Sequence, residues 1–218
     1  MSQEKPKRKE FDLVCFQNKL MSADVRKTVA ALFVMPDGCY SGLDFVDLWP
    51  ESRDAMLYAG PLPVVAHPPC ARWSILAGLV EKLHGIKRGA DGGTFQSALA
   101  SVRKYGGVLE HPAESAAFRK YDLPRPVRGA WVRTFCGGWV TEVAQSTYGH
   151  RAVKMTWLYY VGKAAPPALD WSIAIATARV SEAMNRGGKT VERMSRRERI
   201  VTPVRFRDLL LKMAMGAQ

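Results

Sequence analysis

The stretch VVAHPPCARWS, residues 64–74, constrains the fold more than any other part of the sequence. An apolar run of strand length ends at His67, and two prolines and Cys70 follow. Proline lacks a backbone N–H and restricts the residue before it, so the backbone must leave the strand there with little freedom. In an open α/β sheet, ligands bind outside such strand ends. We therefore predict that the Cys70 thiol is held at the mouth of a site.

The patterns around this turn predict an α/β fold. Strand-like runs are expected at 28–35, 45–49, 62–66, 108–111, 131–140 and 153–161, and helices at 73–84, 94–105 and after Thr202-Pro203. Thr94 and Thr202 are the expected helix N-caps. Two strands separated by helical segments favour a parallel pair with a crossover. We expect a three-layer domain, with a mostly parallel, twisted sheet and helices on both faces.

The expected organisation has four parts. They are a basic N-terminal tail and lead-in at 1–27, an α/β catalytic core at 28–162, a short variable basic insert at 163–200 that contacts nucleic acid, and a C-terminal helix at 201–218 that packs on the core. No apolar run approaches the roughly 20 residues of a membrane span, and no secretory signal is apparent. These features indicate a cytoplasmic protein.

Charge and cysteine content narrow the function. The formal net charge is +12, and the segment 179–207 alone holds eight arginines. Such a balance favours an anionic partner, and DNA or a nucleotide is the first candidate. The cysteines at 15, 39, 70 and 136 form no CxxC pair, so neither a zinc knuckle nor a disulfide framework is indicated.

Four motifs then occur in a recognisable order. They are HPPCARWS at 67–74, VLEHP at 108–112, YGHRAVK at 148–154 followed by LYYVG at 158–162, and TP at 202–203. In order and content they resemble motifs of the DNA cytosine-5 methyltransferases: the proline-cysteine nucleophile loop, a strand-end Glu-Asn-Val, the Q-x-R-x-R strand region and the segment before the closing helix. The resemblance covers roughly residues 44–215 and implies a methyltransferase-like fold.

The resemblance implies a covalent reaction on a pyrimidine base, in DNA or in a pyrimidine nucleotide. Cys70 would add to C6, so that C5 becomes enamine-like and attacks an electrophile, and Glu110 would hold or donate a proton beside N3. Arg72 is expected to lower the pKa of the Cys70 thiol. A base in duplex DNA would have to be flipped out of the stack. The other residues expected to bind substrate are His67, Pro69, Arg72, Ser74, His111, Arg151 and Lys154, and those expected to bind DNA are Arg193, Arg196, Arg197 and Arg199.

The resemblance also implies S-adenosylmethionine as the donor, with Asp47 as the acidic residue that contacts its adenosine. The glycine-rich loop that seats this donor is missing, because residues 33–42 offer only Gly38 and Gly42. Our hypothesis is that the chain keeps the covalent chemistry but uses another electrophile, or acts on an already modified base. A compact, basic variant of this kind fits a bacteriophage base-modifying enzyme.

Two alternatives remain open at this stage. His67, Cys70, His111 and His150 could form a zinc site, although the HxE and PCxxC signature of zinc deaminases is absent. The chain could instead be a non-catalytic basic DNA-binding protein, which leaves the rigid HPPC turn and Glu110 unexplained. Trp73 could stack on a flipped base or pack in the core.

Overall fold

A seven-stranded sheet, in the order β2-β1-β3-β4-β7-β6-β5, forms the centre of the computed structural model, which describes residues 26–180 and 191–218. The strands are β1 (Val29–Leu32), β2 (Val46–Trp49), β3 (Val64–Ala66), β4 (Gly107–Pro112), β5 (Val132–Arg133), β6 (Trp139–Ala144) and β7 (Met155–Val161). Strands β2, β1, β3 and β4 pair in parallel, and β7 is antiparallel to β4. Because β6 is antiparallel to β7, it runs in the same direction as β4. The prediction of an α/β fold with a mostly parallel sheet is confirmed.

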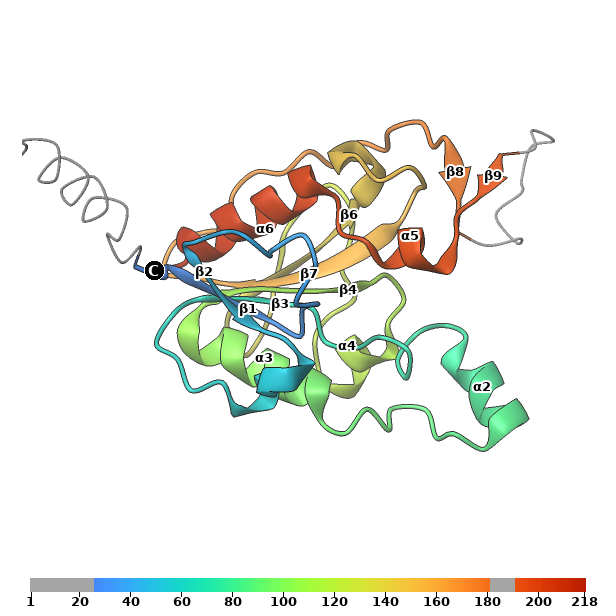
Figure 1. Ribbon diagram of the computed structural model, residues 1–218, viewed down its shortest axis with the longest axis horizontal. Coiled ribbons are helices and arrows are strands. Elements are labelled where there is room, and N and C mark those ends of the chain that lie inside the picture. The colour runs from blue at the N-terminus through green and yellow to red at the C-terminus, as the bar shows by residue number, and fades with distance from the viewer. Residues whose placement is uncertain (1–25, 181–190) are drawn as a thin grey trace, which may run out of the picture.

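Helices cover the sheet on both sides (Figure 1). One side carries α3 (Thr94–Tyr105) and α4 (Ala116–Lys120), and the other carries α6 (Val204–Met215). A short helix, α2 (Ala77–His84), projects from the body, and α5 (Arg196–Ile200) lies near the two-stranded sheet of β8 (Ala178–Arg179) and β9 (Glu192–Arg193). The 3-10 helices are η1 (Glu51–Arg53), η2 (Ala55–Leu57) and η3 (Gln145–Tyr148).

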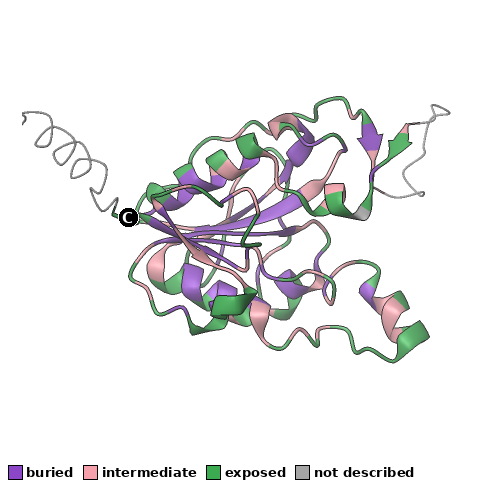
Figure 2. Ribbon diagram, in the orientation of Figure 1, coloured by how far each residue is buried: buried purple, intermediate pink, exposed green. Residues whose placement is uncertain are grey.

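Two hydrophobic clusters, one on each face of the sheet, hold these layers together. Successive side chains of a strand point to opposite faces, so Leu109 of β4 packs in the cluster with Phe95 of α3, whereas Val108 packs with Phe206 of α6. Strands β1, β3, β4 and β7 are buried almost throughout their length, whereas β2 and β5 are mostly half-buried or exposed (Figure 2). This alternation also decides which face receives each functional side chain at the end of β4.

Several local predictions need correction. Helix α3 does begin at Thr94, but its N-cap is Gly93, and Asp91 accepts hydrogen bonds from the backbone of Gly93 and Phe95. Helix α6 begins at Val204 without a side-chain cap, so Thr202 is not its N-cap. The parallel pairing of β3 with β4 through the intervening helices is as predicted.

The segment predicted as a nucleic-acid-contacting insert, 163–200, divides into two parts. Its first part covers the α6 side of the core, where Leu169 and Trp171 pack against the second cluster and the Trp171 indole donates to Thr141 Oγ1 at 3.0 Å. Its last part contains β8, β9 and α5. The predicted tail at 1–27 falls almost entirely outside the described residues, as does 181–190. Within the described ranges, no helix has the length and apolar character needed to span a membrane.

Candidate functional site

The carboxyl edge of the sheet brings together side chains that are far apart in the sequence. His67 and Cys70 follow β3, Glu110 lies near the end of β4, and Gln145 follows β6. Because β7 is antiparallel to these strands, its beginning lies at the same edge and brings Lys154 there. This is the edge at which open α/β sheets bind ligands.

The turn that carries Cys70 is fixed by hydrogen bonds from both sides. The backbone N–H of His67 donates to the carbonyl of Leu32 at 3.1 Å, and the N–H groups of Trp73 and Ser74 both donate to the carbonyl of Cys70 at 3.0 Å. Trp73 is 4% exposed, and its indole N–H donates to Asp91 Oδ2 at 2.9 Å. Trp73 therefore packs in the core, as one of its two expected roles required, and anchors the turn.

The Glu110 carboxylate contacts two side chains at this edge, one through each oxygen. His67 Nδ1 lies 3.0 Å from Glu110 Oε2, and the Gln145 amide donates to Glu110 Oε1 at 3.1 Å. The same amide donates to Thr156 Oγ1 at 2.9 Å, which orients it. Behind His67, the Tyr40 hydroxyl lies 2.8 Å from Nε2. We call this series of contacts the Tyr40–His67–Glu110 chain.

These contacts keep Glu110 ionised. Burial raises the pKa of its carboxyl, but the hydrogen bond from His67 and the charge of Lys154 lower it, with a net pKa of about 2. Burial raises the pKa of the Cys70 thiol, and Glu110 raises it further, whereas Lys154 lowers it. The charge of Lys154 thus lowers the pKa of both Glu110 and Cys70, and the charge of Glu110 raises that of Cys70.

Cys70 therefore differs from expectation in its electrostatics. The sequence predicted that Arg72 would lower the pKa of the thiol, but the interacting cation is Lys154 and the net direction is upward. Arg72 lies two residues further along the turn, half-buried, and its carbonyl accepts a hydrogen bond from Gly89. Pro69 is exposed and Ser74 is half-buried on the same turn.

His111 lies on the other face of the sheet from Glu110. Its side chain is fully buried, and its ring packs edge-on against Phe95 at 5.1 Å between centroids. Burial lowers its pKa to about 4, although the Glu110 charge and the backbone of Pro69 oppose this. His111 thus lies in the core next to the backbone of Pro69, whereas the sequence predicted that it would bind substrate.

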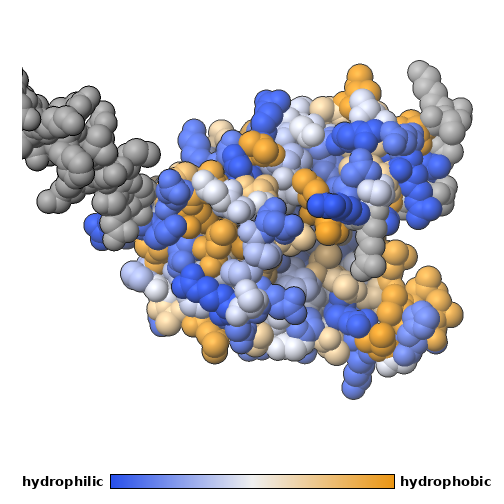
Figure 3. All heavy atoms as spheres, viewed as in Figure 1, coloured by the Kyte–Doolittle hydropathy of each residue, from blue (hydrophilic) through white to orange (hydrophobic). Residues whose placement is uncertain are grey.

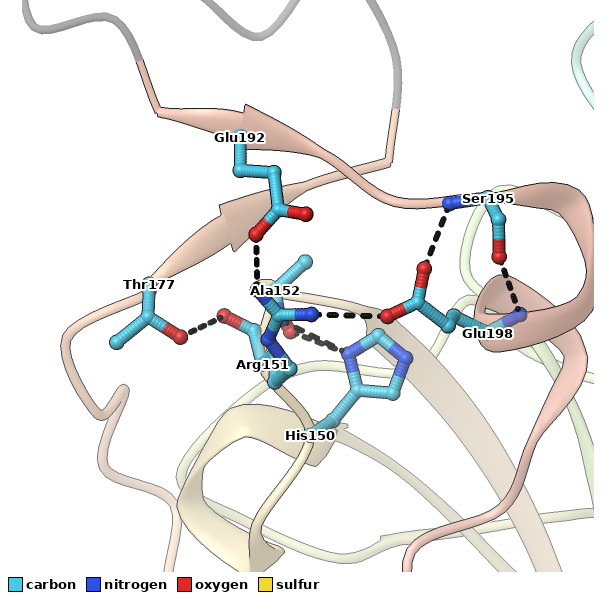
Figure 4. Close-up of polar contacts among 7 residues, drawn as sticks. All are labelled: His150, Arg151, Ala152, Thr177, Glu192, Ser195 and Glu198. Atoms are coloured by element: carbon cyan, nitrogen blue, oxygen red, sulfur yellow. Dashed lines mark hydrogen bonds and ion pairs between the residues drawn. The ribbon is translucent and has the colours of Figure 1, made fainter.

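Arg151, which the sequence assigned to phosphate or base binding, is held by protein carboxylates (Figure 4). It forms ion pairs with Glu192 of β9 and with Glu198 of α5, the latter at 2.8 Å. Glu198 also completes a capping box with Ser195 at the start of α5. Arg151 therefore fastens the β9–α5 segment to the loop before β7, and it lies outside the cluster formed by Cys70, Glu110 and Lys154.

The predicted DNA-binding arginines lie on this same segment. Arg193 and Arg197 are exposed, and Arg199 donates to the carbonyl of Val180 at 3.2 Å. The side chain of Arg196 lies outside the described part of the structure. The α5 region and the projecting α2 border a notch in the surface, visible on the right of Figure 3.

Asp47, the expected contact for the adenosine of S-adenosylmethionine, accepts hydrogen bonds from two neighbouring side chains. Its Oδ1 binds Arg53 Nη1 at 2.6 Å, and its Oδ2 accepts from the Trp49 indole at 2.7 Å. The Tyr40 side chain, from the loop after β1, is 2% exposed and extends to His67. Asp47 and Tyr40, at the expected donor position, are thus held by contacts within the protein, and S-adenosylmethionine as the donor stays a prediction.

Potential metal ligands are dispersed. Among residues 26–180 and 191–218, no group of three or more His, Cys, Asp or Glu side chains is arranged to hold a metal ion. His150, one of the four residues considered for a zinc site, has its Nδ1 within 2.7 Å of the carbonyl oxygen of Ala152.

Three residues of the site were not predicted from the sequence: Tyr40, Gln145 and Thr156. Gln145 had a detectable signal, because it directly follows a strand whose carboxyl end lies at the same edge as those of β3 and β4. Tyr40 lies in an irregular loop with no motif, so only the tertiary fold brings it to His67.

No protein-family model matches this sequence, and no curated protein is significantly similar to it. The geometry at the carboxyl edge must therefore carry any functional conclusion.

Proposed function

We propose that this protein modifies a pyrimidine base in DNA, with the Cys70 sulfur adding covalently to C6 so that a group can be transferred to C5. The proposal takes up the resemblance to the DNA cytosine-5 methyltransferases in the HPPC and LEHP motifs. Its strongest support is that Cys70, Glu110 and Lys154 lie at the same edge of the sheet, where hydrogen bonds from His67 and Gln145 hold the Glu110 carboxylate.

The chemistry requires a nucleophile and an ionisable group beside the same ring. The Cys70 thiol first loses its proton to solvent, and the resulting thiolate, stabilised by Lys154, forms a bond to C6 while the C5=C6 electrons move to C5. C5 then bonds to an electrophile, which loses its leaving group. Departure of the C5 proton and rupture of the S–C6 bond restore the ring. Without an electrophile, C5 takes a proton from water and the same reversal exchanges the C5 hydrogen with solvent.

DNA is the proposed substrate because of the charge distribution around this edge. The whole chain carries +12, Arg193 and Arg197 are exposed, and the α5 region borders the notch (Figure 3). Phosphate contacts from such residues position a nucleic acid without reading its sequence. A base in duplex DNA must leave the stack before a thiol can reach C6.

The donor proposed here is an electrophile other than S-adenosylmethionine. Asp47 binds Trp49 and Arg53, and the loop at 33–42 lacks the glycine-rich pattern that would seat that donor. No step of the proposed reaction uses S-adenosylmethionine.

Exchange of the C5 hydrogen tests the covalent step without a donor. DNA with tritium at C5 of its cytosine and uracil bases is incubated with the protein, and tritium released into water is measured. We expect release well above the buffer rate from the wild-type protein and none above that rate from Cys70→Ser. Because DNA is held by charged groups elsewhere, Cys70→Ser should still bind DNA in a filter-binding assay.

The matched control is Cys136→Ser, which removes an exposed thiol from the loop before β6 and should release tritium at the wild-type rate. Equal release by Cys70→Ser and the wild-type protein would contradict the proposal. So would the absence of release from both labelled bases, which is the result expected of a non-catalytic DNA-binding protein.

A further inference from the structure

The hydrogen bonds around Glu110 have a definite direction. Tyr40 is buried, and burial raises the pKa of its hydroxyl well above the ordinary value, so the hydroxyl keeps its proton and donates to His67 Nε2. Because the Glu110 carboxylate can only accept, its contact with His67 places a hydrogen on Nδ1 of the ring. That hydrogen is directed at Glu110 Oε2, 3.0 Å away. In the Tyr40–His67–Glu110 chain, the N–H of His67 therefore donates a hydrogen bond to the Glu110 carboxylate.

Gln145 supplies a second donor from the opposite side. Its Nε2 carries hydrogens only, and it contacts both Glu110 Oε1 at 3.1 Å and Thr156 Oγ1 at 2.9 Å. The Thr156 hydroxyl in turn lies 3.4 Å from the carbonyl of Lys154, to which it donates, so it is free to accept from the amide. This arrangement fixes the amide with its nitrogen towards Glu110.

Two donors thus hold Glu110 as a carboxylate that can only accept. An ionised carboxylate has about four acceptor positions, and His67 and Gln145 use two of them. The side chain is 11% exposed, and a base would have to reach the remaining positions from that exposed part. The Lys154 ammonium, which interacts with both Glu110 and Cys70, can only donate.

We infer that the site around Cys70 and Glu110 selects uracil-type pyrimidines over cytosine, because the N3–H of uracil can donate to Glu110. This inference rests on the proposed function. The ring edge of uracil presents an N3–H donor between two carbonyl acceptors, so an acceptor-only carboxylate suits its centre and an ammonium suits either flank. Cytosine presents a lone pair at N3, which would face the carboxylate unless a proton were supplied. Glu110, with a pKa of about 2, holds no such proton at neutral pH.

The test compares two oligonucleotides that differ only in the labelled base, one with a single [5-³H]deoxyuridine and one with a single [5-³H]deoxycytidine. We expect tritium release from deoxyuridine to be faster than from deoxycytidine by roughly tenfold or more. This is the ratio expected when two buried acceptors, N3 of cytosine and the Glu110 carboxylate, face each other without a hydrogen. Glu110→Gln, whose amide both donates and accepts, should reduce this ratio towards one. His67→Phe, which removes the Nδ1–H donor, should also reduce it, and Cys136→Ser should leave it unchanged.

Each outcome separates the inference from the proposed function. Equal or faster release from deoxycytidine by the wild-type protein would overturn the inference and leave the covalent chemistry standing. If Glu110→Gln and His67→Phe both kept the wild-type ratio of deoxyuridine to deoxycytidine release, the selectivity would not come from the Tyr40–His67–Glu110 chain. Release from neither oligonucleotide would refute the proposed function itself.

Discussion

At the scale of single residues, His111 makes the protein sensitive to acid. Burial lowers its pKa from 6.5 to about 4, so the folded state favours the neutral ring. The resulting stability is present above about pH 6.5, the unfolded value, and is lost as the pH falls towards 4. The full contribution is on the order of 3 kcal/mol, of which about 2 kcal/mol is lost by pH 5.

We predict that His111→Phe removes this acid sensitivity. Phenylalanine has nearly the same shape as histidine, can keep the edge-on contact with Phe95, and carries no titratable group. Between pH 7.5 and pH 5, the free energy of unfolding of His111→Phe should therefore fall by about 2 kcal/mol less than that of the wild-type protein. Urea titrations at the two pH values measure it, with His84→Phe, at an exposed position in α2, as the control. Equal losses in wild-type and His111→Phe would contradict the prediction.

Among the elements, α2 shows why a periodic pattern does not identify the surface that a helix packs against. The sequence predicted a helix with Leu76, Leu79, Val80 and Leu83 on one side, and α2 does form. Yet Leu79 is 53% exposed and Leu83 is 66% exposed, because the helix projects from the body instead of lying on the sheet (Figure 1). Apolar spacing predicts an amphipathic helix, but the chain path after the Cys70 turn decides where it lies.

The exposure of α2 leads to a prediction about stability. Leu79→Ala and Leu83→Ala should each change the free energy of unfolding by less than about 0.5 kcal/mol, as expected for surface positions. Leu99→Ala, in the buried face of α3, should cost about 2–5 kcal/mol, because it leaves a cavity between helix and sheet. Urea unfolding of the three variants measures the contrast. A cost above 2 kcal/mol in either α2 variant would mean that this face is covered in the folded protein.

The strand ends illustrate what sequence reasoning achieved. The prolines after β3 and β4 marked where each strand stops, and the predicted pairing of these strands through a crossover is confirmed. The alternation of β4 was not used in the prediction, and it separates Glu110 from His111. Arg151 was assigned to ligand binding from its motif alone, because its partners Glu192 and Glu198 lie more than forty residues away in sequence.

Across the whole molecule, the distribution of charge predicts how DNA binding depends on salt. Arg197 is exposed on α5, whereas Arg133 is exposed at the opposite edge of the sheet, where it pairs with the first residue of β6. Arg197→Gln should weaken binding uniformly across sequences and reduce the slope of log K against log salt by about 1.

The measurement is filter binding of one duplex at a series of salt concentrations. Arg133→Gln removes the same charge and serves as the control, with a slope like that of the wild-type protein. If both variants reduced the slope equally, binding would reflect the overall charge of the chain and not the face bordering the notch.

The sequence by itself determined the α/β class, the parallel pair on either side of the HPPC turn and the position of a thiol at a strand end, because proline restriction and apolar periodicity act locally. Only the tertiary structure decided which side chains meet that thiol. Lys154 replaced Arg72 as its cation, and Tyr40 and Gln145 joined Glu110, because sheet order and strand direction bring distant segments to one edge. The chemistry at C6 is therefore proposed from a local motif, whereas selection of the base depends on long-range contacts.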